Sequence, residues 1–135
     1  MYLLDTNILS ELIRKRPNTS LMDTLRTCPA DALSTSCICL MELRHGAARS
    51  RGPRALWRRI EHEILERVTV LEVRAEDALL AGDLQAELWA LGKPIETEDL
   101  LIGASALARG FTVVTHNVSH FRRIPGLRVE DWMTS

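Results

Sequence analysis

Short apolar stretches alternate with amphipathic ones along the chain, and this alternation predicts strands that alternate with helices. The apolar run at residues 1–4 stops at Asp5 and is typical of a strand that is buried on both faces. The other strand-like segments are rich in apolar and β-branched residues, and they lie at 33–36, 68–73, 111–115 and 127–129.

Helical periodicity fills the segments between these strands. Thr6 and Asn7 can cap a first helix, which Pro17 ends. Thr97 can cap a later helix that runs to Arg109. The other predicted helices span residues 20–26, 38–49, 53–67 and 75–91. Strands and helices in this order predict a three-layer α/β/α fold with a mostly parallel central sheet of four to five strands.

Length and composition indicate one ordinary globular domain. The chain has 135 residues without repeats or linkers, so we expect residues 1–135 to form a single domain. Apolar residues make up 46% and charged residues 26%, which excludes an intrinsically disordered chain. Aromatic residues make up only 4%, which disfavours a base-stacking platform for single-stranded nucleic acid.

The sequence gives no sign of export or of a membrane. No stretch approaches the roughly 18 apolar residues of a membrane helix. No basic segment precedes the apolar start, so we expect no secretory signal. Cys28, Cys37 and Cys39 form no C-x-x-C pair, which disfavours a disulfide framework or a thiolate zinc site. These features predict a cytoplasmic protein.

Charge is concentrated in two segments whose signs cancel in the net charge of −1. Residues 43–60 carry arginines and no acid, whereas residues 72–99 carry eight acids against two basic residues. The basic segment is either a solvated helix face or a ridge that contacts phosphates. Arginine is strongly preferred over lysine, which occurs only at Lys15 and Lys93, and this favours phosphate contact. The arginines of the basic segment are Arg44, Arg49, Arg51, Arg54, Arg58 and Arg59.

Four oxygen-bearing side chains lie near the ends of predicted strands. Asp5 directly follows the first strand, and Asn117 lies two residues beyond Thr115, the last residue of its strand. Glu42 lies in the helix after the second strand, and Asp99 lies in the first turn of the helix before the 111–115 strand. Open α/β sheets bind ligands beyond the carboxyl ends of their strands, so these side chains are expected to converge there.

Taken singly, most of these residues also have an ordinary structural interpretation. Asp5 can be only a helix cap, Glu42 only a solvated side chain, and Asn117 only a turn residue. His116 and His120 are four residues apart, but no glutamate follows the first histidine as a zinc-protease helix requires. We therefore expect both histidines to be loop residues.

Asp99 is harder to explain structurally, because residues 100–108 form an uncharged, apolar helix that should be buried. Two like charges about 4 Å apart repel by about 4 kcal/mol at an effective dielectric of about 20. An ionised cluster of Asp5, Glu42 and Asp99 therefore needs a cation. Oxygen ligands without histidine or cysteine select Mg²⁺ or Mn²⁺, which points to phosphodiester chemistry.

Four segments resemble PIN-domain proteins, most closely the VapC toxins of bacterial toxin–antitoxin pairs. The segments cover nearly the whole chain in the expected order: YLLDTNILSEL, LMELRHGA, GKPIETEDLLIGASALARG and TVVTHNVSHFRRIPGLRVEDW. The resemblance implies a compact α/β/α fold and an endoribonuclease that depends on Mg²⁺ or Mn²⁺. It also implies a homodimer and a VapB-like antitoxin that blocks the site in a hetero-oligomer.

The resemblance also implies roles for individual residues. The family's acids fall on Asp5, Glu42 and Asp99, and its fourth polar position falls on Asn117, where many PIN domains have aspartate. This departure supports one ion better than two. Asp5 and Asp99 would hold the ion, with Glu42 binding directly or through water, and the products would be a 5′-phosphate and a 3′-hydroxyl. The residues expected beside the ligands are Thr6, Asn7 and Thr115. The arginines expected to hold RNA are Arg44, Arg49 and Arg51.

Three alternative hypotheses about the function use the same residues. One is an RNA-processing PIN nuclease that is not a toxin. Another is a non-catalytic binding module, in which the carboxylates only cap helices and pair with arginines. The third is a phosphohydrolase or receiver domain, which ranks last because Asn7 stands where a phosphatase has its second acid.

Overall fold

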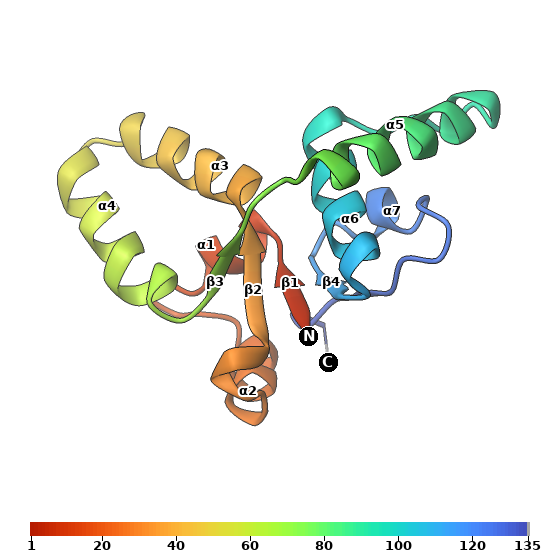
Figure 1. The fold of residues 1–135 in the computed structure, drawn as a ribbon. Coiled ribbons are helices and arrows are strands. Elements are labelled where there is room, and N and C mark those ends of the chain that lie inside the picture. The colour runs from red at the N-terminus through yellow and green to blue at the C-terminus, as the bar shows by residue number, and fades with distance from the viewer. Residues whose placement is uncertain (135) are drawn as a thin grey trace.

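The computed structural model describes residues 1–134 and has a central sheet of five parallel strands. The strand order is β3-β2-β1-β4-β5, so the first strand of the chain lies in the middle (Figure 1). This confirms the predicted parallel sheet. The strands are β1 (Tyr2–Leu4), β2 (Leu33–Ser36), β3 (Thr69–Leu71), β4 (Thr112–Val114) and β5 (Val129–Glu130).

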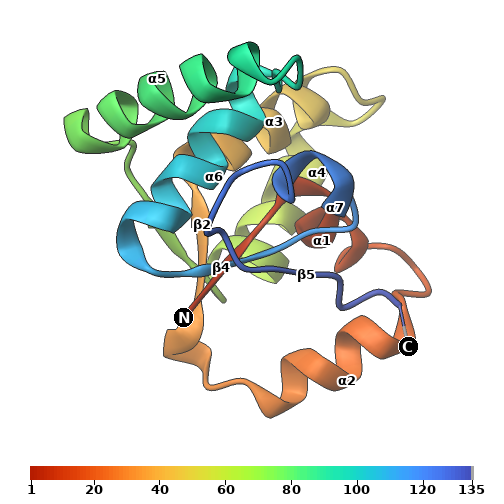
Figure 2. The same cartoon turned by 90° about the vertical axis from the view of Figure 1, so that its right-hand side faces the viewer.

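Helices cover both sides of this sheet. In Figure 1, α3 and α4 lie on the left of the strands, and α5, α6 and α7 lie on the right. Figure 2, turned by 90°, shows α2 at the opposite end of the molecule from α5. The predicted three-layer fold is therefore confirmed. The helices are α1 (Thr6–Glu11), α2 (Thr19–Thr27), α3 (Cys37–Ala48), α4 (Pro53–Ile60), α5 (Ala75–Ala90), α6 (Thr97–Arg109) and α7 (Val118–Phe121).

The core forms where the middle strands meet the flanking helices. Leu3, Leu4, Val113 and Val114 are fully buried, because helices cover both faces of β1 and β4. Helix α6 is also mostly buried, as its uncharged sequence predicts. Its Gly103 leaves no room for a Cβ against the side chain of Ile124, so α6 packs closely on the segment after α7. In residues 1–134 no helix has the length and apolar character needed to cross a membrane.

Several boundaries differ from the sequence prediction. Helix α1 ends at Glu11 rather than near Pro17, because the buried Glu11 carboxylate accepts hydrogen bonds from Arg14 and from the Asn18 backbone. Thr97 is the first residue of α6 and not its cap, which is Glu96.

The remaining differences lie near the ends of elements. Helix α4 is followed by a π-helical turn at Glu61–Leu65 rather than continuing to Arg67. Strand β3 is shorter than predicted, and β5 starts two residues later. The four-residue helix α7 was not predicted, because one turn is too short to show periodicity.

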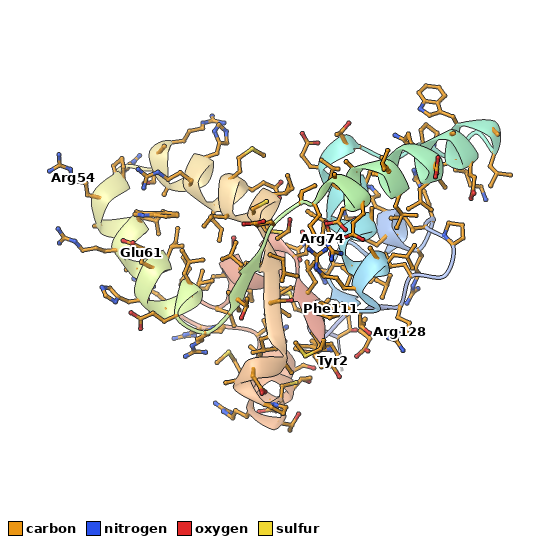
Figure 3. All side chains as sticks on the ribbon, in the orientation of Figure 1. Tyr2, Arg54, Glu61, Arg74, Phe111 and Arg128 are labelled. Atoms are coloured by element: carbon orange, nitrogen blue, oxygen red, sulfur yellow. The ribbon has the colours of Figure 1, made fainter. Side chains whose placement is uncertain are left out.

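A buried ion-pair network fixes α5 against α6. The carboxylate of Asp77 accepts hydrogen bonds from Arg74 and Arg109, each at 3.0 Å, and its side chain is completely buried. Arg74 lies where the chain passes from β3 into α5 (Figure 3). Arg109 also donates to the carbonyls of Ser105 and Glu72. The network therefore joins the start of α5 to the end of α6.

Candidate metal centre

Asp5 is the first residue after the central strand β1. Its backbone N–H donates a 2.9 Å hydrogen bond to the Val114 carbonyl, and its carboxylate accepts a 2.8 Å hydrogen bond from the Thr6 backbone N–H. The side chain is almost fully buried, and this burial raises the pKa of Asp5, with the charges of Asp99 and Glu42 adding to the rise. Asp5 is thus a helix cap as well as a member of an acidic cluster, so the two interpretations of this residue are compatible.

Two side chains hold the other oxygen of Asp5. The hydroxyl of Thr115 donates to Oδ2 at 2.9 Å and accepts a hydrogen bond from the Asn117 backbone N–H, also at 2.9 Å. The amide nitrogen of Asn7 lies 3.3 Å from both Asp5 Oδ2 and Thr115 Oγ1. Asn7 Oδ1 in turn accepts from the His116 backbone at 3.0 Å. Asn7 and Thr115 therefore tie the end of β1 to the end of β4.

Glu42 reaches the same site from α3. This helix begins directly after β2, where the Ser36 hydroxyl caps it by accepting a hydrogen bond from the Ile38 backbone. The Glu42 carboxylate accepts a 2.6 Å hydrogen bond from the hydroxyl of Thr6. The first turn of α1 and the second turn of α3 therefore meet at this pair, next to Asp5.

Cys39 also belongs to the cluster, which the sequence did not indicate. Its Sγ lies 3.9 Å from Asp5 Oδ1, and the side chain is fully buried. Burial raises the pKa of the Cys39 thiol to about 11, with the charge of Asp5 adding to the effect. Ligand atoms of Asp5, Cys39 and Glu42 all lie within 4.8 Å of one another. The only sequence signal for this role is that Cys39 precedes Glu42 by three residues and so shares its helix face.

Asp99 lies in the first turn of α6, on the opposite side of the site from Glu42. Its Oδ2 lies 3.0 Å from Nδ1 of His120, which is itself 2.9 Å from the amide nitrogen of Asn117. One ring nitrogen carries either a proton or a lone pair, so His120 either donates to Asp99 or accepts from Asn117. His120 was expected in a loop, but it lies on α7 and contacts the acidic site. His116 does lie in a loop, where it pairs with Asp131 at 3.0 Å.

A groove of about 590 Å³ separates α3 from the start of α6 and opens over the carboxylates. Its two walls carry Glu42 on one side and Asp99 on the other. The residues that line it are Met41, Glu42, His45, Gly46, Glu96, Glu98 and Asp99. An acidic groove of this kind excludes an anionic substrate unless cations neutralise its walls.

The donors fit a divalent cation. Carboxylate oxygens of Asp5, Glu42 and Asp99 are hard ligands of the type that Mg²⁺ and Mn²⁺ prefer. The raised pKa of Asp5 shows a carboxylate that a nearby positive charge would favour. The sulfur of Cys39 and the ring nitrogen of His120 also touch two of the carboxylates, which the sequence did not indicate.

The arginine-rich segment forms α4 and the end of α3. The Arg44 guanidinium lies over the ring of Trp57, 4.7 Å from its centroid. Arg54 projects outward from α4 on the left of Figure 3. Within residues 1–134, Arg44, Arg49 and Arg51 form no ion pair, which leaves their charges available to a partner.

Comparison with known proteins defines the class to which this fold and site belong. The family model described as the PIN domain matches residues 2–127. The chain therefore belongs to the PIN-domain family. PIN domains are metal-dependent nucleases, and this agrees with the donor set of the acidic cluster.

Several relatives carry names that are more specific than the family's. The chain is 37% identical to the tRNA(fMet)-specific endonuclease VapC of Salmonella typhimurium, with 97% of each chain covered. It is 32% identical to Ribonuclease VapC2 of Rickettsia felis, with 98% of each covered. Among solved structures, a chain of VapBC2 from Rickettsia felis bound to a promoter DNA fragment matches with a TM-score of 0.88 and 33% identity. That match covers 97% of this chain and 98% of the other.

Proposed function

We propose that this chain is an endoribonuclease that acts as the toxin of a VapBC-type toxin–antitoxin pair and forms one nuclease domain. The observation that carries the proposal is the pair of acids Asp5 and Glu42 at the carboxyl ends of parallel strands, with Asp99 across the groove from Glu42. Relatives named as ribonucleases and endonucleases match along nearly their whole length and support the same activity.

In this proposal Asp5 and Asp99 would hold Mg²⁺ or Mn²⁺, and Glu42 would bind it directly or through water. A bound ion would supply an activated water molecule and offset the charge that develops on the phosphate oxygens. Glu42 would accept the proton of the attacking water, and the hydrogen bond from Thr6 would fix the carboxylate for this step. Thr115 orients the Asp5 carboxylate through its 2.9 Å hydrogen bond to Oδ2.

Asn117 occupies the fourth polar position with a neutral amide. Its backbone bonds Thr115 and its side chain contacts His120, so it links the Asp5 side of the site to the Asp99 side. A neutral group at this position adds no further negative charge. The negative charge of the site therefore matches one divalent ion better than two.

We expect the basic segment to bind the RNA substrate. Arg44, Arg49 and Arg51 supply unpaired positive charge that can contact phosphates. We also propose that the chain acts in the cytoplasm, where a toxin of this kind would meet its RNA substrate.

Two protein partners are part of the proposal. Solved structures of relatives include the VapBC-1 complex of nontypeable Haemophilus influenzae, at 36% identity and a TM-score of 0.86. We expect a VapB-like antitoxin to bind this chain and block its site. A homodimer or a larger toxin–antitoxin hetero-oligomer remains a prediction, which light scattering of the purified chain with and without the antitoxin would measure.

The decisive experiment measures cleavage of RNA by the purified chain with Mg²⁺, with a chelator, and after Asp5→Asn or Asp99→Asn. We expect cleavage with Mg²⁺ and its loss in the other three conditions. Full activity of both folded variants would refute the site. A chain that binds Mg²⁺ but cleaves no RNA would support the non-catalytic module instead. Growth arrest on expression, relieved by a neighbouring antitoxin gene, would distinguish a toxin from an RNA-processing nuclease.

A further inference from the structure

We propose that Cys39 is a ligand for thiophilic divalent ions in the acidic cluster, so that Cd²⁺ and Zn²⁺ bind there through a sulfur bond that Mg²⁺ does not form. The inference rests on the proposed function, since it concerns the same metal site. It adds a regulatory consequence, because a thiophilic ion would compete with Mg²⁺ for Asp5 and Glu42.

The geometry allows these donors to share one ion. Ligand atoms of Asp5, Cys39 and Glu42 lie within 4.8 Å of one another. Zinc bonds of about 2.3 Å to sulfur and about 2.1 Å to oxygen place neighbouring tetrahedral ligands about 3.5 Å apart. Side-chain movements on the order of an ångström would therefore bring all three donors to one ion.

The position of Cys39 in its helix directs the sulfur into the site. Cys39 is the third residue of α3, and Glu42 follows one turn later on the same face. The sulfur contacts a carboxylate oxygen, Asp5 Oδ1. Cys37 is two residues earlier, on a different face of the helix, and is only half-buried. Cys39 is thus the thiol that the fold brings to the carboxylates.

The chemistry of the donors separates two classes of ion. Mg²⁺ is a hard ion that takes oxygen ligands and retains water, so it uses the carboxylates and leaves the thiol protonated. Cd²⁺ and Zn²⁺ accept thiolate ligands. When either binds, the metal–sulfur bond replaces the S–H bond and the proton passes to solvent.

The competing interpretation is that Cys39 only fills the core, as buried cysteines commonly do. A sole-thiol chain with Cys28→Ser and Cys37→Ser distinguishes the two. The experiment titrates this chain with Cd²⁺ and, separately, with Mg²⁺, and records calorimetric affinity together with ultraviolet absorption. Cys39→Ser and Cys39→Ala in the same background serve as comparisons, and their unfolding temperatures check the fold.

We expect the sole-thiol chain to show a thiolate-to-Cd²⁺ charge-transfer band that Cys39→Ser and Asp5→Asn weaken or remove. Cys39→Ser should lower Cd²⁺ affinity by about tenfold or more, a difference of about 1.4 kcal/mol, and change Mg²⁺ affinity by less than about twofold. Absence of the band in the sole-thiol chain at saturating Cd²⁺ would overturn the inference, as would equal Cd²⁺ affinity in the folded Cys39 variants.

The two proposals fail in different ways. If the chain cleaves RNA with Mg²⁺ but shows no Cd²⁺–thiolate band, the nuclease proposal stands and the role of Cys39 is wrong. If the band forms but Mg²⁺ supports no cleavage, Cys39 is a metal ligand and the nuclease proposal is wrong.

Discussion

The hydroxyl of Thr115 donates a 2.9 Å hydrogen bond to the carboxylate of Asp5, although the two residues are 110 positions apart in the chain. The bond joins the ends of β1 and β4, which are neighbours in the sheet. Asp5 is buried, so each donor to its carboxylate matters to the charge it can carry.

Thr115→Val removes this donor while keeping the size and branching of the side chain. We expect a stability loss of about 1 kcal/mol, the usual net contribution of one hydrogen bond, and a weaker affinity for Mg²⁺. Thermal unfolding and calorimetric Mg²⁺ titration measure the two effects. Thr112→Val, on the strand β4 that leads into Thr115, is the control and should leave Mg²⁺ affinity unchanged. Equal Mg²⁺ affinity in the two variants would contradict the role of Thr115.

Asp5→Asn should change the free energy of unfolding in opposite directions with and without metal. Without metal, the variant loses a buried charge that burial, Asp99 and Glu42 all disfavour, so it should be at least as stable as the wild type. At a Mg²⁺ concentration of about 100 times Kd, the wild type gains about 2.7 kcal/mol and the variant gains little. Unfolding curves with and without Mg²⁺ test this crossover. Asp83→Asn, at an exposed position of α5, should respond to Mg²⁺ as the wild type does.

Asp77→Asn should destabilise the chain by about 3 kcal/mol, because it leaves Arg109 without its buried partner. Burial alone would raise the pKa of Asp77, but the hydrogen bonds from Arg74 and Arg109 outweigh it and hold that pKa below its usual value. The stabilisation is therefore present above about pH 4 and is lost as the pH falls through the lowered value.

Denaturant unfolding of the wild type and Asp77→Asn across acidic pH tests this linkage. The difference between the two chains should narrow as the pH falls below about 4. Asp23→Asn, which removes an exposed pair with Arg26, is the matched control and should change stability little at any pH. A constant difference between wild type and Asp77→Asn would contradict the prediction.

Replacing Arg44, Arg49 and Arg51 by glutamine should weaken RNA binding about equally for all sequences. Each lost phosphate contact should reduce the slope of log affinity against log salt by about 1. Binding is measured with the Asp5→Asn chain at several KCl concentrations, so that the RNA stays intact. Arg26→Gln on α2 is the control. An unchanged salt slope in the triple variant would place RNA elsewhere.

The sequence predicts the parallel sheet and the four polar positions for a simple physical reason. Apolar runs that stop at a polar residue identify where a strand ends, and parallel strands end at one edge of a sheet. Asp5 and Asn117 can be located in this way, and the uncharged helix after Asp99 indicates that its carboxylate lies near the core. The structure brings Asp5 and Glu42 together and places Asp99 across the groove from Glu42.

The contributions of Cys39 and His120 could not be predicted, because they depend on tertiary placement. The contact of Cys39 with Asp5 depends on how α3 is rotated against the end of β1. The contact of His120 with Asp99 requires α7, whose single turn has no periodic signal. The sequence predicts helix α1 to be longer than it is for a similar reason. The hydrogen bond between the Glu11 side chain and the Asn18 backbone, which ends the helix early, cannot be seen in the sequence pattern.

The central position of β1 has a consequence for protein synthesis. Strand β1 pairs on one side with β2 and on the other with β4, which is synthesised much later than β1. A nascent chain therefore lacks half of the pairing of β1 and all of the Asp99 side of the site until α6 and β4 have emerged from the ribosome. Translation products that stop before α6 should be inert.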